Sequence, residues 1–387
     1  MKKLKLIVGL ALAAGLMTAG ISPAARVVNA EEELAPACKA AYACDYTSGT
    51  VVYSKNETER LPIASMCKIM TLLLSFEAAD RGELSYDEPV TVSENAAGMG
   101  GSQVFLEKGL TYTAGELLKT IAVCSANDSC VAMAERVAGS ESAFVDRMNA
   151  RAKELGAENT LFANCTGLPK ETQYSCAKDV SLMLRAMLSH EKYFEFSRVW
   201  LEDFAHPDGR TTSITNTNKL IRAYEGCDGG KTGFTNEAGF CLAATAKRGD
   251  TRLISVVLGG ESSEKRFKAV SSMLDYGFNA YETKVMLDAN VALEQRANVR
   301  GGRQKDVSVI AETPLKAFCK RGETGDFTLA MSFNEELKAP ISTGDQVGTA
   351  TLYRDGIEVC TTRLLCAESV GRLSWWDAVQ ESAKNWN

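Results

Sequence analysis

The 387-residue chain is poor in histidine, since His190 and His206 are the only two, and both lie in polar surroundings. A hydrolase that activates serine through an imidazole needs a histidine beside its nucleophile, and the G-x-S-x-G turn of one large class of such enzymes is absent. We therefore interpret both histidines as exposed residues without a catalytic role. The scarcity of histidine and the lack of any C-x-x-C pair also argue against a metal site, and we expect no cofactor.

Long apolar runs are missing beyond the N-terminus. The one such stretch covers residues 6–21, follows the basic start MKKLK and precedes the small residues of Val28-Asn29-Ala30. This is the pattern of a secretory signal peptide, and its 16 apolar residues fall short of the roughly 20 that span a membrane. We expect residues 1–30 to be removed after Ala30. The mature protein would then lie at the extracytoplasmic face of the cell membrane or in the cell wall or periplasm, with a membrane anchor as the alternative.

The chain also lacks an excess of positive charge. Its formal net charge is −6 at pH 7, and residues 1–30 contain four cationic side chains and no acid, so the remainder is more acidic still. Such a body is a poor partner for nucleic acid. The length is enough for two or three domains of roughly 100 to 200 residues each.

Cysteine, in contrast, is abundant. Twelve cysteines in an exported protein would ordinarily indicate disulfides. However, Cys67, Cys124, Cys130 and Cys241 lie inside apolar helix or strand patterns, where a free thiol behaves as a small hydrophobic group. The sequence leaves both interpretations open.

The apolar pattern of the chain changes near residue 283, which predicts two domains. Helices and strands precede that point, whereas short alternating strands follow it, with a hairpin turn at Asp355-Gly356. We expect an α/β (α+β) domain with an antiparallel sheet over residues 31–282 and a small all-β sandwich domain over residues 283–368. The elements expected in the first domain are two strands around a Ser48-Gly49 turn, helices from Ser65 and over 114–139, 142–156, 178–189 and 272–281, and strands over 239–248 and 251–260.

The last segment, residues 369–387, is a candidate amphipathic tail. Its tryptophans would suit a membrane interface, but its acidic and basic residues balance, so anionic lipid would not attract it. Peripheral membrane contact and packing against the β domain are both left open. The apolar residues near helical spacing are Val370, Leu373, Trp376, Val379 and Ala383.

The stretch IASMCKIM at residues 63–70 places a serine and a lysine in an apolar helix. Ser65 and Lys68 are three positions apart and so share one helix face. Pro62 indicates that the helix begins just upstream, which puts Ser65 in the first turn, where unpaired N–H groups favour an oxyanion. Desolvation lowers the pKa of a buried lysine, and a neutral amine could accept the serine proton.

Two further motifs follow. Ser125-Ala126-Asn127 lies within the helix predicted over 114–139, and Lys231-Thr232-Gly233 lies at the start of the hairpin strands. A serine three residues before a lysine recurs at Ser262, and Ser-x-Asn recurs elsewhere, so neither pattern is specific alone; Lys-Thr-Gly occurs once. Together, in this order, the three elements resemble those of penicillin-recognising serine enzymes.

The flanking sequences GSQVFLEKG, NTLFANCTGLP and DGGKTGFTNEAGFC narrow the resemblance. They look like those of low-molecular-mass penicillin-binding proteins that are serine D-alanyl-D-alanine carboxypeptidases, over about residues 38–368. The resemblance implies a transpeptidase-like catalytic fold, removal of the terminal D-alanine from peptidoglycan pentapeptides, and covalent inhibition by β-lactams. One departure is Cys67, where the family usually has threonine, and it could tune the site or expose a thiol near the nucleophile.

The resemblance also implies roles for four residues in the chemistry. Ser65 would attack the carbonyl of the penultimate D-alanine and form an acyl-enzyme, with Lys68 as the base. Ser125 would relay a proton to the leaving D-alanine, and Asn127 would hydrogen-bond the peptide or Lys68.

Five more residues would bind substrate. Lys231 and Thr232 would meet the terminal carboxylate, and Gly233 would let the strand approach closely. The N–H groups of the nucleophile and of Phe234 would form the oxyanion hole. Arg266 corresponds to a family arginine near the carboxylate, and its alternative interpretation is a solvated charge at the start of a helix.

Two rival functions remain. A related β-lactamase would need a glutamate-activated water, usually within Glu-x-x-Leu-Asn, and the chain has no Leu-Asn dipeptide. A non-catalytic wall-binding protein would have no reason to keep a costly buried lysine. The sequence therefore favours the carboxypeptidase.

Overall fold

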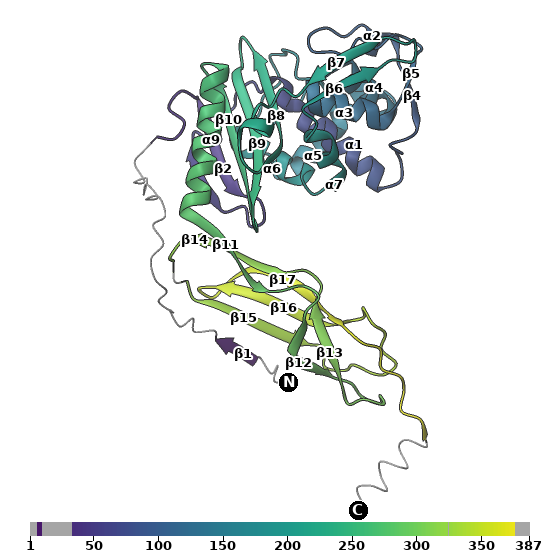
Figure 1. The fold of residues 1–387 in the computed structure, drawn as a ribbon, viewed down its shortest axis with the longest axis vertical. Coiled ribbons are helices and arrows are strands. Elements are labelled where there is room, and N and C mark those ends of the chain that lie inside the picture. The colour runs from purple at the N-terminus through teal and green to yellow at the C-terminus, as the bar shows by residue number, and fades with distance from the viewer. Residues whose placement is uncertain (1–5, 10–32, 324, 376–387) are drawn as a thin grey trace, which may run out of the picture. The chain divides into compact units, whose positions relative to one another are not determined.

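The computed structural model describes residues 6–9, 33–323 and 325–375, and these form two compact units that part between Ala280 and Tyr281 (Figure 1). Most of the predicted signal peptide and the end of the predicted tail, from Trp376 onward, lie outside the described residues. Within the described part, no helix has both the length and the apolar character that crossing a membrane requires.

The first unit is built on a five-stranded antiparallel sheet in the order β3-β2-β10-β9-β8 (Figure 1). The two strands predicted around Gly249 are confirmed, and that glycine has φ +57°, as a tight hairpin turn requires. Because β8 lies at the edge, one side of its backbone is not paired within the sheet. The strands are β2 (Ala40–Asp45), β3 (Val51–Lys55), β8 (Cys227–Thr235), β9 (Gly239–Arg248) and β10 (Thr251–Gly260).

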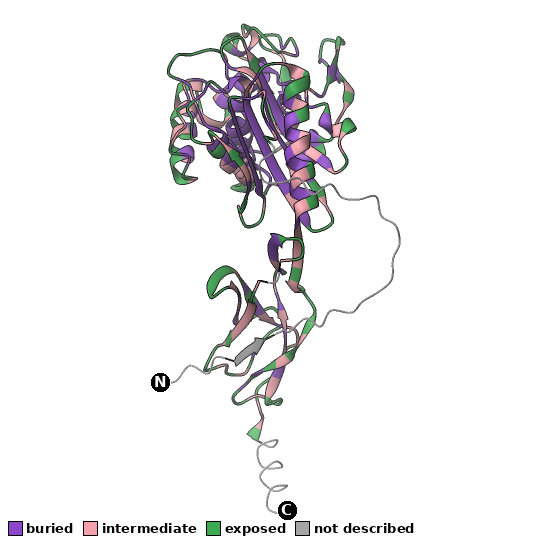
Figure 2. Ribbon diagram, turned by 90° about the vertical axis from the view of Figure 1, so that its left-hand side faces the viewer, coloured by how far each residue is buried: buried purple, intermediate pink, exposed green. Residues whose placement is uncertain are grey.

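Helices cover both faces of this sheet, so its central strands are buried (Figure 2). Helix α9 (Ser263–Ala280) packs on β9 and β10, and α6 (Ala177–Met187) packs on β10 and β2. The closing helix was predicted to begin at Ser272, which is wrong. It begins at Ser263, because the side chain of Ser262 accepts a hydrogen bond from the Lys265 N–H and caps a polar first turn.

The helical part of this unit surrounds α1 (Lys68–Asp80), which is buried along most of its length. A 3₁₀ turn, η1 (Ala64–Cys67), precedes α1, so the predicted single helix around Ser65 is in fact two elements. The helix predicted over 114–139 is also wrong as one element: α3 ends at Cys124, the next residue Ser125 has φ +67°, and α4 begins at Asn127. The remaining helices are α2 (Glu94–Ala97), α3 (Ala114–Cys124), α4 (Asn127–Ala138), α5 (Glu141–Glu154), α7 (Glu191–Ser197) and α8 (Leu220–Ala223).

Two short antiparallel strand pairs that the sequence pattern did not reveal lie among the helices of this unit. They pair β4 (Pro89–Thr91) with β5 (Thr111–Thr113) and β6 (Leu201–Ala205) with β7 (Thr211–Thr215).

The second unit is rich in β-structure, as predicted. It contains a six-stranded antiparallel sheet in the order β1-β15-β16-β17-β13-β12 and a separate pair, β11-β14. The hairpin turn at Asp355-Gly356 has positive φ at both residues, +49° and +79°. The strands are β1 (Leu6–Gly9), β11 (Tyr281–Leu287), β12 (Ala292–Asn298), β13 (Asp306–Ala311), β14 (Leu315–Lys320), β15 (Phe327–Phe333), β16 (Gln346–Arg354) and β17 (Ile357–Cys366).

Residues 369–374, at the start of the tail, are not helical. Val370 is buried and forms a bridge with Ile341, and the Leu373 N–H donates to the Gly301 carbonyl. These residues therefore pack on the β-rich unit. They do not form the helix that their spacing suggested.

Candidate active site

Ser65 and Lys68 are in contact at the junction of η1 and α1. The Nζ atom of Lys68 lies 2.9 Å from the Ser65 Oγ and 2.5 Å from the carbonyl oxygen of Thr166. The Lys68 side chain is fully buried, and this burial lowers the pKa of its amine. Neither hydrogen-bond partner carries a negative charge, and burial is the largest influence on this pKa.

The segment after Phe162 holds this lysine in place, and it is the main part of the site that sequence reasoning missed. The side-chain oxygen of Asn164 accepts from the N–H groups of Thr166 and Gly167, at 3.2 and 2.7 Å, which fixes the segment in a tight turn. Three successive carbonyl oxygens then face α1. Those of Asn164, Cys165 and Thr166 accept hydrogen bonds from Cys67, Thr71 and Lys68, respectively.

The same turn packs directly against the residue before the nucleophile. Ala64 has φ +49°, a left-handed conformation that is uncommon for alanine. A Cβ atom at Gly167 would lie 2.0 Å from the Ala64 carbonyl oxygen. Only glycine at position 167 therefore permits this approach. The strained backbone of Ala64, next to Ser65, is kept in place by its contact with this turn.

Cys67 does not expose a thiol near the nucleophile, contrary to one expectation. Its side chain is fully buried and donates to the Asn164 carbonyl at 3.1 Å, and burial raises the pKa of the thiol well above its ordinary value. All twelve cysteines lie within the described residues, and none forms a disulfide.

Ser125 and Asn127 lie where α3 gives way to α4. The Ser125 hydroxyl oxygen and the Asn127 Oδ1 are both buried and have no hydrogen-bond partner among the described residues. The Asn127 Nδ2 donates to the Gly100 carbonyl at 2.7 Å, and the Asn127 N–H donates to the Ser102 carbonyl at 2.7 Å. Unpaired buried polar atoms are costly, and these two are available to a bound substrate.

The Lys-Thr-Gly motif lies on the edge strand β8, next to η1. A Cβ atom at Gly233 would lie 2.6 Å from the Ile63 carbonyl oxygen, so the strand and the nucleophile turn approach as closely as glycine allows. Lys231 is buried, and its pKa is lowered to about 7, first by burial and then by the positive charges of Lys68 and Arg266. The motif lysine and the candidate base are therefore electrostatically coupled.

Thr232 and Phe234 lie on either side of that glycine along β8. The Thr232 hydroxyl donates to the Thr217 hydroxyl, with 2.8 Å between the two oxygens. Phe234 is 51% exposed, and its ring packs on Phe240 with 4.4 Å between ring centroids.

Arg266 is not a solvated charge at a helix start, so that interpretation is wrong. It lies in the first turn of α9, is buried, and donates through Nη1 to the carbonyls of Gly233 and Cys241, at 3.0 and 3.1 Å. Its guanidinium therefore supports β8 from the α9 side.

Both histidines are tied into the fold instead of exposed. His206 is 5% exposed and hydrogen-bonds Tyr112 and Thr212, at 2.8 and 2.9 Å. His190 bonds Asp80 at 2.7 Å and leaves only 10% of its side chain exposed. The prediction of exposure failed because it used only the polar residues next to each histidine in the sequence. Residues far from each histidine in the sequence help to cover it.

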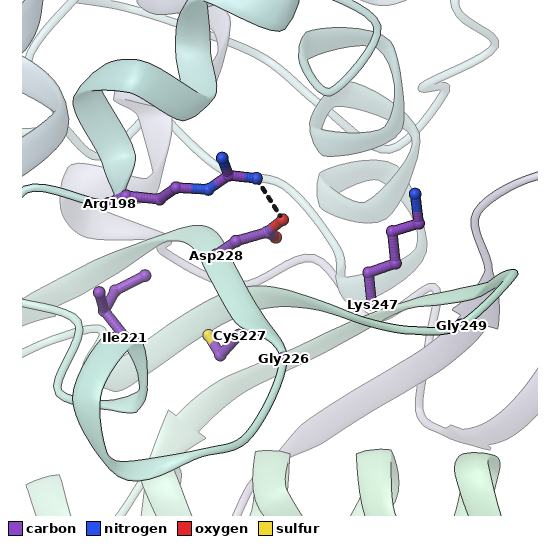
Figure 3. Close-up of a pocket in the computed structure, with 7 residues that line it drawn as sticks. All are labelled: Arg198, Ile221, Gly226, Cys227, Asp228, Lys247 and Gly249. Carbon is purple, nitrogen blue, oxygen red and sulfur yellow. Dashed lines mark hydrogen bonds and ion pairs between the residues drawn. The ribbon is translucent and has the colours of Figure 1, made fainter.

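A depression at the other end of β8 holds none of the predicted site residues (Figure 3). Its acid, Asp228, pairs with Arg198 at 3.2 Å and with Arg252 at 2.7 Å. Cys227 lies four strand positions from Lys231, or roughly 13 Å. The lining residues are Arg198, Ile221, Gly226, Cys227, Asp228, Lys247 and Gly249.

Residues 27–262, which include all of these motifs, match the D-alanyl-D-alanine carboxypeptidase family. The chain belongs to this family. Residues 281–372 match the C-terminal domain of penicillin-binding protein 5. This carboxypeptidase is therefore a hydrolase of the penicillin-binding protein group, and the family match favours that activity over the two rivals.

Curated relatives agree over most of the chain. D-alanyl-D-alanine carboxypeptidase DacF of Bacillus subtilis is 39% identical, with 92% of this chain and 91% of the relative covered. DacC of Escherichia coli is 32% identical, with 88% and 87% covered.

Solved structures confirm the predicted fold class. PBP3 of Streptococcus pneumoniae has a TM-score of 0.74 at 26% identity, with 86% of this chain and 99% of that chain covered. Penicillin-binding protein 5 of Haemophilus influenzae has a TM-score of 0.67 at 26% identity, covering 91% and 100%. Penicillin-binding protein D2 of Listeria monocytogenes, solved with ampicillin bound, has a TM-score of 0.58 at 32% identity, covering 64% and 100%.

Proposed function

We propose that this carboxypeptidase removes the terminal D-alanine of peptidoglycan pentapeptides through an acyl-enzyme on Ser65. The observation that carries the proposal is the 2.9 Å contact between the Ser65 hydroxyl and the buried Lys68 amine. Because burial favours the neutral amine, Lys68 can accept the Ser65 proton without an imidazole.

Acylation then follows. The Ser65 oxygen attacks the carbonyl carbon of the penultimate D-alanine, and the resulting oxyanion is stabilised by the N–H groups of Ser65 and Phe234. The C–N bond breaks, and the leaving amino group of D-alanine takes a proton that originated on Ser65. The hydroxyl of Ser125, buried and without another partner, is suited to carry that proton from Lys68.

Deacylation returns the enzyme to its starting state. A water molecule gives a proton to Lys68 as it attacks the ester carbon of the acyl-enzyme, and the C–O bond to Ser65 breaks. The Ser65 oxygen recovers a proton from Lys68, and the shortened peptide leaves with a new carboxylate.

Recognition of the terminal carboxylate is assigned to Lys231 and Thr232. The Lys231 ammonium group is a suitable donor for a carboxylate, and the Thr232 hydroxyl, which donates to Thr217, lies at the next position of β8 beside the nucleophile turn. The Asn127 side chain, whose Oδ1 has no other partner, is placed to accept from an N–H group of the peptide.

Penicillins would acylate the same serine. Their lactam carbonyl occupies the place of the scissile amide, and ring opening leaves an ester on Ser65 that is released slowly. Penicillin-binding protein D2 of Listeria monocytogenes was solved in ampicillin-bound and cefotaxime-bound forms, which supports the same chemistry here.

The reaction requires export, since peptidoglycan lies outside the cytoplasm. Residues 1–30 have the pattern of a signal peptide, and we place the mature enzyme at the extracytoplasmic face of the membrane or in the wall or periplasm. The mature chain isolated from the producing cell should begin at Glu31. An N-terminal peptide that still contains residues 1–30 would refute cleavage.

The activity is tested by mass spectrometry of a pentapeptide that ends in two D-alanines. The enzyme should remove one alanine, whereas Ser65→Ala should abolish both D-alanine release and covalent labelling by a fluorescent penicillin. Ser54→Ala, at an exposed position of β3, is the control and should behave as the parent does. Labelling or release that persists in Ser65→Ala would refute the nucleophile assignment.

A further inference from the structure

Thr217 belongs to none of the three sequence motifs, yet its hydroxyl is the partner of the Thr232 hydroxyl. The two oxygens are 2.8 Å apart, and Thr232 is the donor. Thr217 lies in the short connection between β7 and α8, fifteen positions before Thr232, so the contact depends on the fold.

The asparagines on each side of Thr217 fix this connection. Asn216 donates through Nδ2 to the carbonyls of Ser197 and Val199, at 2.9 and 2.8 Å. Asn218 accepts from the Leu220 N–H at 3.1 Å and donates to the Gly229 carbonyl at 3.3 Å. Both asparagines are buried, whereas Thr217 is partly exposed, so Thr217 is a held side chain that solvent or a ligand can reach.

The backbone of Thr217 is tied to the other side of the site. Its N–H donates to the Val123 carbonyl at 3.1 Å, two positions before Ser125 in the sequence. Thr217 thus connects the segment that carries Ser125 with the strand that carries Lys231 and Thr232.

The direction of the Thr232 hydrogen bond determines which proton faces a ligand. A hydroxyl has one proton to donate and two lone pairs to accept. Because Thr232 gives its proton to Thr217, the proton still free for an anion is that of Thr217. Hydrogen bonds in such a chain polarise one another, which makes the terminal hydroxyl a stronger donor.

We propose that Thr217 is a substrate-binding residue whose hydroxyl donates to the terminal carboxylate of the peptide, in the order Thr232 to Thr217 to carboxylate. This role rests on the proposed carboxypeptidase function and adds a specificity-determining hydroxyl to the carboxylate site. A neutral donor matters here, since Lys231 loses its charge as the pH rises through about 7.

The test compares variants that keep or remove the hydroxyl. Thr217→Val and Thr217→Ala should raise KM about tenfold for the peptide with a free terminal carboxylate, with kcat little changed, as for a lost uniform binding contact. On the same peptide with a terminal amide both variants should behave as the parent does. Thr217→Ser keeps the hydroxyl, and its KM should stay within about threefold of the parent value. The same is expected of Thr215→Val, a control at an exposed threonine of β7.

A double-mutant cycle tests the hydroxyl chain itself. The double variant carries both Thr217→Val and Thr232→Val. If Thr232 acts through Thr217, the factor by which KM rises in the double variant should be well below the product of the factors for the two single variants. Independent, multiplicative effects would overturn the chain.

Three further results would overturn the role of Thr217 in an active parent. They are an unchanged KM in both hydroxyl-free variants, equal losses on free and amidated peptides, and a defect in Thr217→Ser as large as that in Thr217→Val. A parent enzyme that releases no D-alanine from either peptide would instead overturn the proposed function, and this proposal with it.

Discussion

A methyl group added at Gly167 would lie 2.0 Å from the Ala64 carbonyl oxygen and 2.8 Å from the Ser65 nitrogen. Ordinary contacts of a Cβ atom begin near 3.4 Å, so in Gly167→Ala the turn that carries the nucleophile has to move by more than 1 Å. Displacing a catalytic group by about 1 Å can cost about 100-fold in rate. We therefore expect Gly167→Ala to acylate with penicillin about 100-fold more slowly than the parent, although no catalytic side chain is changed.

Gly139→Ala is the matched control. Gly139 has φ +81° and Gly167 has φ +82°, so both substitutions carry the same cost of a left-handed alanine, roughly 1–2 kcal/mol, but nothing lies within 4 Å of a Cβ atom at Gly139. The second-order rate constant for acylation by a fluorescent penicillin, measured by stopped flow, separates the displacement of the Ser65 turn from the cost of a left-handed alanine. Thermal unfolding shows whether each variant is folded. If both variants acylate at the same rate, the contact between Gly167 and Ala64 does not position Ser65.

Three further predictions concern titratable groups of the site. Lys68→Ala should slow acylation by about 10²–10⁴, whereas Lys265→Ala, at the exposed Ser-x-x-Lys repeat, should not; equal rate constants would reject Lys68 as the base. Because the pKa of Lys231 is lowered to about 7, its positive charge is lost as the pH rises through that value, so KM for a free-carboxylate peptide should increase between pH 6 and 8.5. The same pH series on the amidated peptide should be flatter, and parallel curves would contradict carboxylate recognition by Lys231. Cys67, buried and with a raised pKa, should stay unmodified by iodoacetamide in the folded enzyme, as peptide mapping can check.

Apolar runs and turn residues in the sequence correctly predicted the two strands of the hairpin in the first unit. The strands Gly239–Arg248 and Thr251–Gly260 are continuous apolar runs joined by a Gly-Asp turn, and both were predicted with their correct bounds. The break at Ser125 was missed because no glycine or proline marks it. A serine with φ +67° is set there by its surroundings in the fold, which a periodic pattern does not record.

In the candidate site, too, contacts between neighbouring residues were predicted and contacts between distant residues were not. Ser65 and Lys68 were predicted to meet because residues three apart share a helix face, and their side chains are in contact. The Thr166 carbonyl that also binds Lys68 is 98 positions away in the sequence, and no local rule predicts such a contact. Arg266 was open to two interpretations because its burial depends on β8 and β9, which only the folded chain brings beside it.

The contact between Arg266 and the Gly233 carbonyl has a consequence for the next residue. A peptide group is one conjugated unit, so a cation held 3.0 Å from its oxygen withdraws electron density from its nitrogen. The nitrogen of this peptide belongs to Phe234, whose N–H is thereby made more acidic. Helix α9 thus influences the polarity of the β8 backbone by induction through an amide, without placing a side chain in the path of the substrate.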